Sequence, residues 1–597
     1  MSQLSRLDRE IATAQHAFIA LCFLRNSHTP VSRLPSEILT HIFSFFRVSH
    51  LDPPDSPCFP PSWIAVTHVC RRWRDVALSS PGLWTNIVMN NKRWMKATLA
   101  RSRNAPISLH LELTYMGVRT DPEVVWVALS HARRVKEISF KGSYLDPYLR
   151  PLFKLAAPLL ESLHLCDKSS SFDLRKGIFL LGQAPKLQSL KLEGCIVNWN
   201  SPLLFCPTLT LLSISFFDRA PQHRLSAVGL RDILMALPNL QYLTLHNMIP
   251  TPMSTLEDPD AKIHLQQLKT LSLSTDVATD IMGVISHLLV PENATLRVEC
   301  NAFGQGYQDS PTSPEVPLAT TLASFYETTS MSNSERARTD GYHAIGFASP
   351  DNKYTLVAGT CYPLLSSEQP DPDHPYSSCS TLWDPEVSLS VAWRNWESSN
   401  PPIQSLFQFA SAFFPLSNVQ TVFVDCFFFR RPEFWWTVFG KMKHVKRLVV
   451  SDNLAFDGFV RALQGEGNTS GTAQVTESHA MLAQLLPADR KGLPRLPHLF
   501  PALTHLTVEG VDFERQEQFE ALLDVLSYRC FKRSGLKRLS RLYLRKCNVR
   551  HEHLVSLAGC ISHEGVDWDK RRRDAHAFSK PKIRMLDELE ENTYFFA

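Results

Sequence analysis

The chain has 597 residues, of which 44% are hydrophobic and 20% charged. These fractions are ordinary for folded globular proteins and argue against a largely disordered chain or a membrane protein, and the length indicates several domains or a repeat architecture. Lysine and arginine outnumber aspartate and glutamate by 62 to 58, an excess too small to make nucleic acid the expected partner.

An apolar stripe begins the chain. Its residues recur every three or four positions, at Leu4, Leu7, Ile11, Ala14, Phe18 and Leu21. This spacing predicts a lead-in helix within residues 1–30, packed on the unit that follows it. A coiled-coil dimer contact is the alternative, and the length of the stripe, only about three heptads, speaks against it. The apolar run "AFIALCFL" is shorter than a membrane span and no cleavage site follows it, so we expect no membrane partner and a cytoplasmic or nuclear protein.

Residues 31–90 are predicted to form a small unit with two helices. The first begins in "SRLPSEILTHIFSFF", where Pro35 suits a helix start and Glu37 suits the positive end of the helix dipole. Its apolar residues are predicted to share one face, and they are Ile38, Leu39, Ile42, Phe43 and Phe46. A proline-rich insert at about residues 48–62 excludes a continuing helix.

The second predicted helix belongs to the segment "VTHVCRRWRDVALSSPGLWTNI". Its apolar stripe consists of Val66, Val69, Cys70, Trp73, Val76 and Ala77. The charged residues off this stripe are predicted to form the solvent-exposed side of the helix, and they are Arg71, Arg72, Arg74 and Asp75. The run Ser79–Gly82 ends the helix, after which Leu83 and Trp84 are expected to fold back as an apolar clip.

From residue 91 to 565 the pattern becomes a repeat of the form L-x-x-L-x-L, as in "LLESLHL", "KLQSLKL" and "NLQYLTL". The middle leucines of six copies stand 27, 22, 31, 28 and 25 residues apart, at Leu163, Leu190, Leu212, Leu243, Leu271 and Leu296. These spacings straddle the roughly 20 to 29 residues typical of a leucine-rich repeat. Three copies carry the N/C position of that repeat, at Cys195, Asn453 and Cys547. The predicted fold is therefore α/β, a short helical unit followed by an irregular leucine-rich-repeat solenoid with a curved, mainly parallel sheet and outer helices.

Two loop-rich insertions interrupt the predicted array, at about residues 301–418 and 464–479. Within the first, "YTLVAGT" and "VSLSVAW" are predicted strands and "IQSLFQFASAFF" is a predicted helix. Residues 566–597 are a charged tail with opposite charges in succession, which we expect to be loosely ordered.

The sequence has no catalytic signature such as G-x-S-x-G, a P-loop or H-E-x-x-H, and its 13 cysteines include no C-x-x-C pair. We therefore expect no enzyme, no metal and no cofactor. Candidate binding residues are instead those that alternate with the repeat leucines onto the exposed face of the sheet. Their aromatic and basic character suits protein recognition, and they are Tyr242, His246, Phe423, Arg447, His505, Arg541, Tyr543 and Arg545.

The helical unit resembles the F-box, in particular the F-box-like form that precedes leucine-rich repeats in large families of mushroom-type fungi. The resemblance rests on motifs that occur in order, namely Leu34-Pro35, Glu37-Ile38-Leu39, Ile42-Phe43, the V-C-R-x-W-R core and Leu83-Trp84. The proline-rich insert departs from the compact motif and lengthens one connection.

The resemblance implies a substrate-recognition adaptor of a cullin-RING (SCF-type) ubiquitin ligase. The F-box would dock on a Skp-type linker protein, and through it on a cullin, while the repeat domain holds an unknown protein substrate. The residues that the resemblance places against the linker are Leu34, Pro35, Ile38, Leu39, Ile42, Val69 and Trp73. Val69 and Trp73 would be shared with the unit's own core. A protein-binding scaffold outside any ligase is the alternative function.

Charge and alternation alone suggest one further hypothesis. Arg447, Arg541 and Arg545 could pair with an acidic or phosphorylated motif of the substrate.

Overall fold

The structure is a computed structural model, and it describes most of the first half of the chain and part of the second. The described residues are 3–49, 61–89, 91–113, 121–217, 225–249, 262–275, 278–291, 294–301, 343–348, 353–359, 387–392, 418–465, 498–514, 516–530, 535–561 and 565–569. The expectations for the proline-rich insert, the 464–479 insertion, the helix "IQSLFQFASAFF" and the charged tail lie largely or wholly outside them. The chain divides into two compact units, Met1–Asp258 with Ile263–Leu268, and Pro259–Lys262 with Lys269–Ala597.

The chain begins with the 25-residue helix α1 (Gln3–Ser27). None of its residues is buried, and its apolar side chains are exposed, from 49% for Leu7 to 70% for Leu4. The helix is therefore where the periodicity predicts it, but the expectation that it packs on the following unit is wrong. An apolar stripe indicates that a helix has a partner and not where the partner lies.

Short helices make up the part of the first unit that follows α1. In chain order they are η1 (Pro30–Arg33), α2 (Ser36–Ser49), η2 (Ser62–His68), α3 (Arg71–Ser79) and η3 (Pro81–Trp84). The second predicted helix is thus two pieces, because the chain leaves helical geometry at Cys70, whose Sγ accepts a hydrogen bond of 3.5 Å from the Trp73 backbone N–H. Cys70 is the N-cap of α3 and not part of a continuous stripe from Val66 to Ala77.

Parallel strands follow directly in the first unit. They are β1 (Asn86–Val88), β2 (Ile107–Glu112), β3 (Val135–Gly142), β4 (Ser162–Asp167), β5 (Ser189–Glu193), β6 (Leu211–Ser215) and β7 (Tyr242–His246). Each pairs in parallel with the next in chain order. The anchor residues share one register across five strands and are at most 1% exposed, in the order Ile138, Leu163, Leu190, Leu212 and Leu243.

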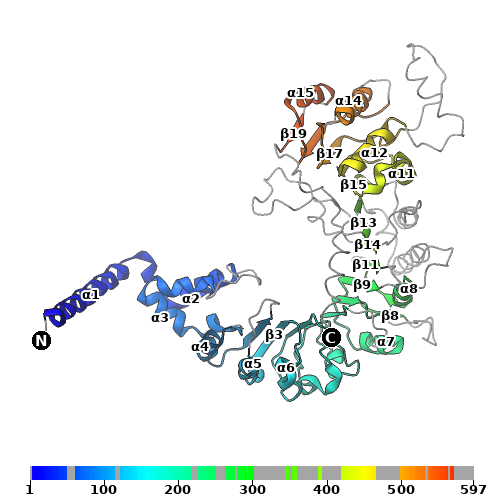
Figure 1. The fold of residues 1–597 in the computed structure, drawn as a ribbon. Helices are drawn as coiled ribbons and strands as arrows, with labels where there is room; N and C mark the ends of the chain where they lie inside the picture. The colour runs from blue at the N-terminus through cyan, green and yellow to red at the C-terminus, as the bar shows by residue number, and fades with distance from the viewer. Residues whose placement is uncertain are drawn as a thin grey trace, which may run out of the picture. The chain divides into compact units, whose positions relative to one another are not determined.

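Helices connect these strands and line one side of the curved sheet, as Figure 1 shows for α5, α6 and α7. The longer ones are α4 (Lys92–Ser102), α5 (Pro122–Leu129) and α7 (Ala227–Met235). The shorter elements are η4 (Ala132–Arg134), α6 (Asp146–Leu149), η5 (Arg150–Phe153), η6 (Leu174–Lys176), η7 (Phe179–Gly182), η8 (Pro202–Phe205) and the two-residue strand β8 (Ile263–His264).

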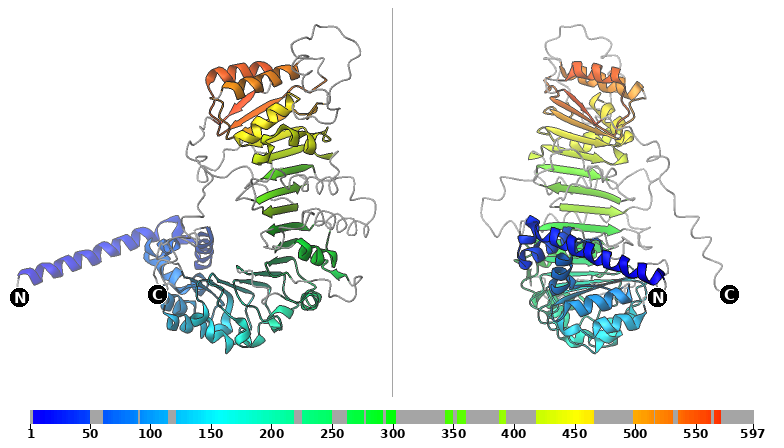
Figure 2. Two further views of the ribbon diagram at one scale, coloured as in Figure 1. Left: turned by 45° about the vertical axis from the view of Figure 1, so that its right-hand side comes forward. Right: turned by 90° about the vertical axis from the view of Figure 1, so that its left-hand side faces the viewer.

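The second unit contains a sheet that is parallel except at one insertion. Its strands are β9 (Thr270–Thr275), β11 (Thr295–Asn301), β12 (Ala344–Ala348), β13 (Lys353–Gly359), β14 (Val387–Ala392), β15 (Thr421–Asp425), β16 (Arg447–Ser451), β17 (His505–Glu509), β18 (Arg541–Arg545) and β19 (Val566–Trp568). The two-residue strand β10 (Leu288–Leu289) is not part of this sheet. The order of paired strands is β9-β11-β14-β13-β12-β15-β16-β17-β18-β19, and β13 alone runs antiparallel to its neighbours β14 and β12. Figure 2 shows these strands as a ladder. The predicted strands "YTLVAGT" and "VSLSVAW" correspond to β13 and β14.

Helices of the second unit follow its strands, as in the first unit. They are α8 (Ala278–Ser286), η14 (Phe427–Arg430), α11 (Pro432–Phe439), α12 (Asn453–Leu463), α14 (Gln516–Cys530) and α15 (His551–Cys560). The anchor residues again share a register and are at most 1% exposed, in the order Val422, Leu448, Leu506 and Leu542. The protein is therefore a mixed α/β structure with an N-terminal helical region and mainly parallel strand pairing.

Candidate protein-docking surfaces

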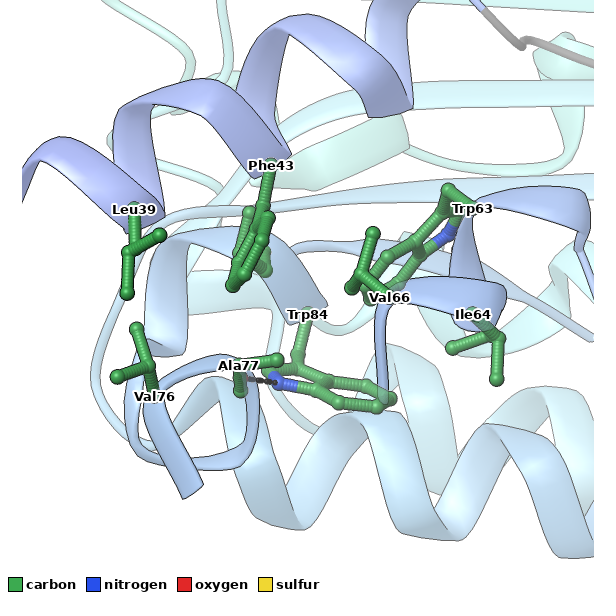
Figure 3. Packing of buried hydrophobic residues seen from close by; sticks show 9 residues of the cluster. Leu39, Phe43, Trp63, Ile64, Val66, Val76, Ala77 and Trp84 are labelled. Atoms are coloured by element: carbon green, nitrogen blue, oxygen red, sulfur yellow. Dashed lines mark hydrogen bonds between the residues drawn. The ribbon is translucent and has the colours of Figure 1, made fainter. Parts of the chain in front are cut away.

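A compact apolar core holds the helical unit together. Its buried members are Leu39, Phe43, Trp63, Ile64, Val66, Val76, Ala77, Leu83 and Trp84. The predicted clip is at its centre: Trp84 is 2% exposed, its ring lies 5.1 Å from the Trp63 ring, and its Nε1 donates a hydrogen bond of 2.7 Å to the Ala77 carbonyl (Figure 3). The clip thereby fixes the end of α3 against the η2 segment.

Two arginines of α3 bind backbone carbonyls of neighbouring segments in addition to lying on its solvent-exposed side. Arg72 donates a hydrogen bond from Nη2 to the Leu34 carbonyl, and Arg74 donates one of 2.8 Å from Nε to the Thr67 carbonyl. These bonds tie α3 to the segment before α2 and to the end of η2. Arg71 and Asp75 fit the solvated expectation, with side chains 81% and 68% exposed, and Arg74 is exposed as well, whereas Arg72 is half-buried.

Helix α2 has two apolar faces. Leu39 and Phe43 are at most 1% exposed and point into the core (Figure 3), whereas Ile38, Ile42 and Phe45 are 48%, 44% and 66% exposed. The steps of four and three residues place Ile38, Ile42 and Phe45 on one outer face of the helix. We call these three residues the α2 outer face.

The residues expected at the linker protein are divided by this geometry. Pro35, Ile38, Ile42 and Val69 are exposed, and Val69 is 58% exposed. Leu34 and Trp73 are half-buried against the core, and the Trp73 ring lies 5.0 Å from that of Phe43. Leu39 is 0% exposed, so its side chain is not available on the surface, which corrects the expectation that it faces a partner.

Phe45 was not among the expected residues. In the sequence, Phe45 could have been assigned to the face of Ile38 and Ile42 because it stands seven residues after the first and three after the second. That signal is ambiguous, because Leu39, Phe43 and Phe46 have the same spacing one residue further on, and periodicity does not say which of two neighbouring stripes is buried.

The strands of the first unit carry a polar face opposite their leucines. At its end, Tyr242 is 40% exposed and His246 is half-buried, both on β7. Further in, Nε2 of His164 lies 3.0 Å from Oε1 of Glu193, and this contact is the main cause that lowers the pKa of the Glu193 carboxyl. Burial raises the pKa of the adjacent Cys166 thiol to about 11, which keeps it protonated and a poor nucleophile.

The second unit places three of the candidate residues in one row. Arg447, His505 and Arg541 are register partners on β16, β17 and β18, at the start of each strand. Arg447 and Arg541 are exposed and His505 is half-buried. Because neighbouring strands lie about 4.8 Å apart, the Cα atoms of the two arginines are within about 10 Å of each other. With its two arginines, the row forms a cationic strip across the amino-terminal ends of β16, β17 and β18.

The other candidate residues of the second unit either contact neighbouring side chains or are buried. Arg545 pairs with Asp567 at 3.1 Å and lies 5.4 Å from the centre of the Tyr543 ring, and Arg541 donates a hydrogen bond of 3.2 Å to the Tyr543 hydroxyl. Phe423 is 2% exposed, which corrects its assignment to the exposed face. On β15 the three central residues are all buried, so strict alternation of buried and exposed positions does not hold there.

The three residues predicted at the N/C position of a leucine-rich repeat have structural roles. Cys547 is 0% exposed and donates from Sγ to the Arg545 and Val508 carbonyls, and burial raises the pKa of its thiol to about 12. Cys195 is 1% exposed, and burial raises its pKa also. Asn453 accepts a hydrogen bond of 2.8 Å at Oδ1 from the Asp512 backbone N–H. These side chains therefore satisfy backbone groups between strands.

The described residues show neither a metal site nor a membrane-spanning helix. They contain no group of three or more His, Cys, Asp or Glu side chains that could hold a metal ion. Among the helices in the same part of the chain, none is long and apolar enough to cross a membrane.

Comparison with known proteins gives a match to the helical unit alone. No curated protein matches the chain. Residues 31–90, which span α2, the tryptophan-rich core and the clip, match the model of the F-box-like family. The chain therefore carries an F-box-like domain at residues 31–90.

Proposed function

We propose that the chain is a substrate-recognition adaptor of a cullin-RING (SCF-type) ubiquitin ligase. F-box domains generally bind Skp-type linker proteins. The observation that carries the proposal here is the α2 outer face, where Ile38, Ile42 and Phe45 remain exposed although the same helix buries Leu39 and Phe43. Exposed apolar side chains that gather on one helix face mark an interaction site.

The sheet that follows would hold the substrate protein. We infer that it is an irregular leucine-rich-repeat array of the kind that follows F-box-like domains in mushroom-type fungi, and the support is the shared register of its anchor residues. In the first unit the polar face offers Tyr242 and His246, and the second unit separately offers the row of Arg447, His505 and Arg541. The cationic row suits an acidic or phosphorylated segment of the substrate, since guanidinium groups bind carboxylate and phosphate with two parallel hydrogen bonds.

In this proposal the chain does no chemistry itself and works in the cytoplasm or nucleus. Its contribution is proximity, because a substrate tethered beside the charged conjugating enzyme reacts as if the encounter were intramolecular. The linker protein and the cullin are then the obligatory partners.

Affinity purification of the tagged full chain tests the proposal. We expect the wild-type chain to retain a Skp-type linker and a cullin, and Ile38→Ser/Ile42→Ser to lose both while keeping its other partners. The matched control is Val127→Ser/Val228→Ser, which removes two valines that are 46% and 41% exposed on α5 and α7. Loss of linker and cullin in both double variants, or in neither, would contradict the proposal. A linker retained by the wild type without any cullin would favour the scaffold function instead.

A further inference from the structure

Helix α1 carries an apolar stripe that the described residues of its own chain do not bury. Its 25 residues include none that is buried, and five large seam side chains, Leu4, Leu7, Ile11, Phe18 and Leu21, are between 49% and 70% exposed. Helices in proteins are stabilised mainly by the packing of an apolar face and less by the intrinsic helix propensity of their residues. The face therefore needs an occupant.

The spacing of the face specifies another helix as that occupant. Leu4, Leu7, Ile11, Ala14, Phe18 and Leu21 follow each other at alternating steps of three and four residues. This period of 3.5 is the one that keeps a seam turned toward a partner helix along its whole length, as at the a and d positions of a coiled coil. The charged residues of this stretch lie outside the seam, and Arg6 and Glu10 pair with each other at 3.1 Å along the same helix.

We propose that α1 pairs with α1 of a second copy of this chain in an antiparallel coiled coil. In that arrangement Leu4 meets the second copy's Leu21, Leu7 meets its Phe18, and Ile11 meets its Ala14. The bulky Phe18 then faces a leucine and the small Ala14 faces an isoleucine, so neither meets its own copy and the seam is filled more evenly. A parallel pair would instead oppose the two Ala14 residues, oppose the two Phe18 residues and place Arg25 of one copy against Arg25 of the other.

The seam is large enough for a specific interface. An exposed leucine, isoleucine or phenylalanine side chain offers on the order of 100 Å² of apolar surface. Ten such side chains from two copies would bury roughly 1,000 Å², which reaches the lower size limit of specific interfaces. The proposal is independent of the proposed ligase function, because the α2 outer face is not part of this seam.

Light scattering after size-exclusion chromatography of the purified full chain tests the proposal. We expect the wild type to have twice the 67.7 kDa mass of one chain. The variant Ile11→Glu/Phe18→Glu should have the mass of one chain, because it places four carboxylates in the seam of the pair. The matched control Thr13→Glu/Ala20→Glu adds the same number of charges on a helix face outside the seam, and this variant should remain a dimer. A wild-type mass of one or three chains, or a seam variant that stays dimeric, would overturn the proposal.

Cysteine cross-linking tests the antiparallel arrangement. In a Cys22→Ser background, Leu4→Cys/Leu21→Cys should form a disulfide between positions 4 and 21 after oxidation with glutathione disulfide. Within one helix these positions are about 26 Å apart, so the bond can only join two copies. Peptide mass spectrometry identifies the linked residues. A disulfide formed by Leu4→Cys alone between two copies would show a parallel pair and overturn this arrangement.

Discussion

Trp84 links two parts of the first unit at the scale of a single residue. Its ring lies 5.1 Å from Trp63 of the F-box-like core and 5.8 Å from Trp94 of α4, and Cζ of Arg101 lies 4.4 Å from its centre. The sequence motif predicted that Leu83 and Trp84 would fold back onto the core, and both are buried. The contacts to α4 could not be predicted, because the ring has two faces and the pattern specifies only one.

Asp425 provides a prediction at the same scale. Its carboxyl lies at the end of β15, where burial, and then the nearby carboxylates of Glu509 and Asp452, raise its pKa from 3.8 to about 6. The folded state therefore binds this proton more tightly than the unfolded state, and the free energy of unfolding should fall as the pH rises from about 4 to about 6. We expect Asp425→Asn to remove this fall and to be more stable than wild type by about 1–3 kcal/mol at pH 7.

Urea denaturation at pH 4 and pH 7 measures the effect. Asp567→Asn is the control, because that aspartate is 57% exposed and its pair with Arg545 should contribute less than about 1 kcal/mol. Equal stabilities of Asp425→Asn and wild type at pH 7 would show that Asp425 is not destabilising when ionised.

At the scale of elements, α12 owes its position to a glycine. A Cβ on Gly458 would lie 1.9 Å from the Phe429 carbonyl oxygen and 2.7 Å from the Arg430 carbonyl carbon, both on η14. The helix therefore packs directly on the backbone of η14. Alanine usually stabilises a helix interior relative to glycine by about 1 kcal/mol, but here the overlap should reverse the sign.

We expect Gly458→Ala to destabilise the chain by about 1–3 kcal/mol in urea denaturation, the usual cost of overpacking. Gly559→Ala on α15 is the matched control, since a Cβ there meets nothing within 4 Å. It should be neutral or slightly stabilising. A stabilising Gly458→Ala would contradict the close approach of α12 to η14.

Elements also show what sequence patterns can and cannot predict. The L-x-x-L-x-L spacing predicted the strands and the anchors that share a register, because apolar alternation follows directly from the pleat of a strand. The burial of Phe423 could not be predicted, because alternation gives the side of the sheet on which a residue lies and not what covers that side. The two faces of α2 present the same difficulty, since both stripes have helical spacing.

At the scale of the molecule, the F-box-like domain continues into the sheet. Residues 31–90 include β1, which pairs in parallel with β2. In this pairing Ile87 lies opposite Leu109. Together with the contacts of Trp84 to α4, this pairing joins the helices of the F-box-like domain to the strands of the same compact unit. A junction of this kind suits the proposed adaptor, because a substrate bound to these strands would keep a defined position relative to α2.

A binding titration between the purified chain and a purified Skp-type linker tests the central claim most directly. We predict that wild type and the Val127→Ser/Val228→Ser control bind with the same affinity. Ile38→Ser/Ile42→Ser should bind at least about 100-fold more weakly, because two apolar side chains are lost from the contact. A wild-type chain that does not bind the linker, or a double variant that binds as tightly as wild type, would contradict the account.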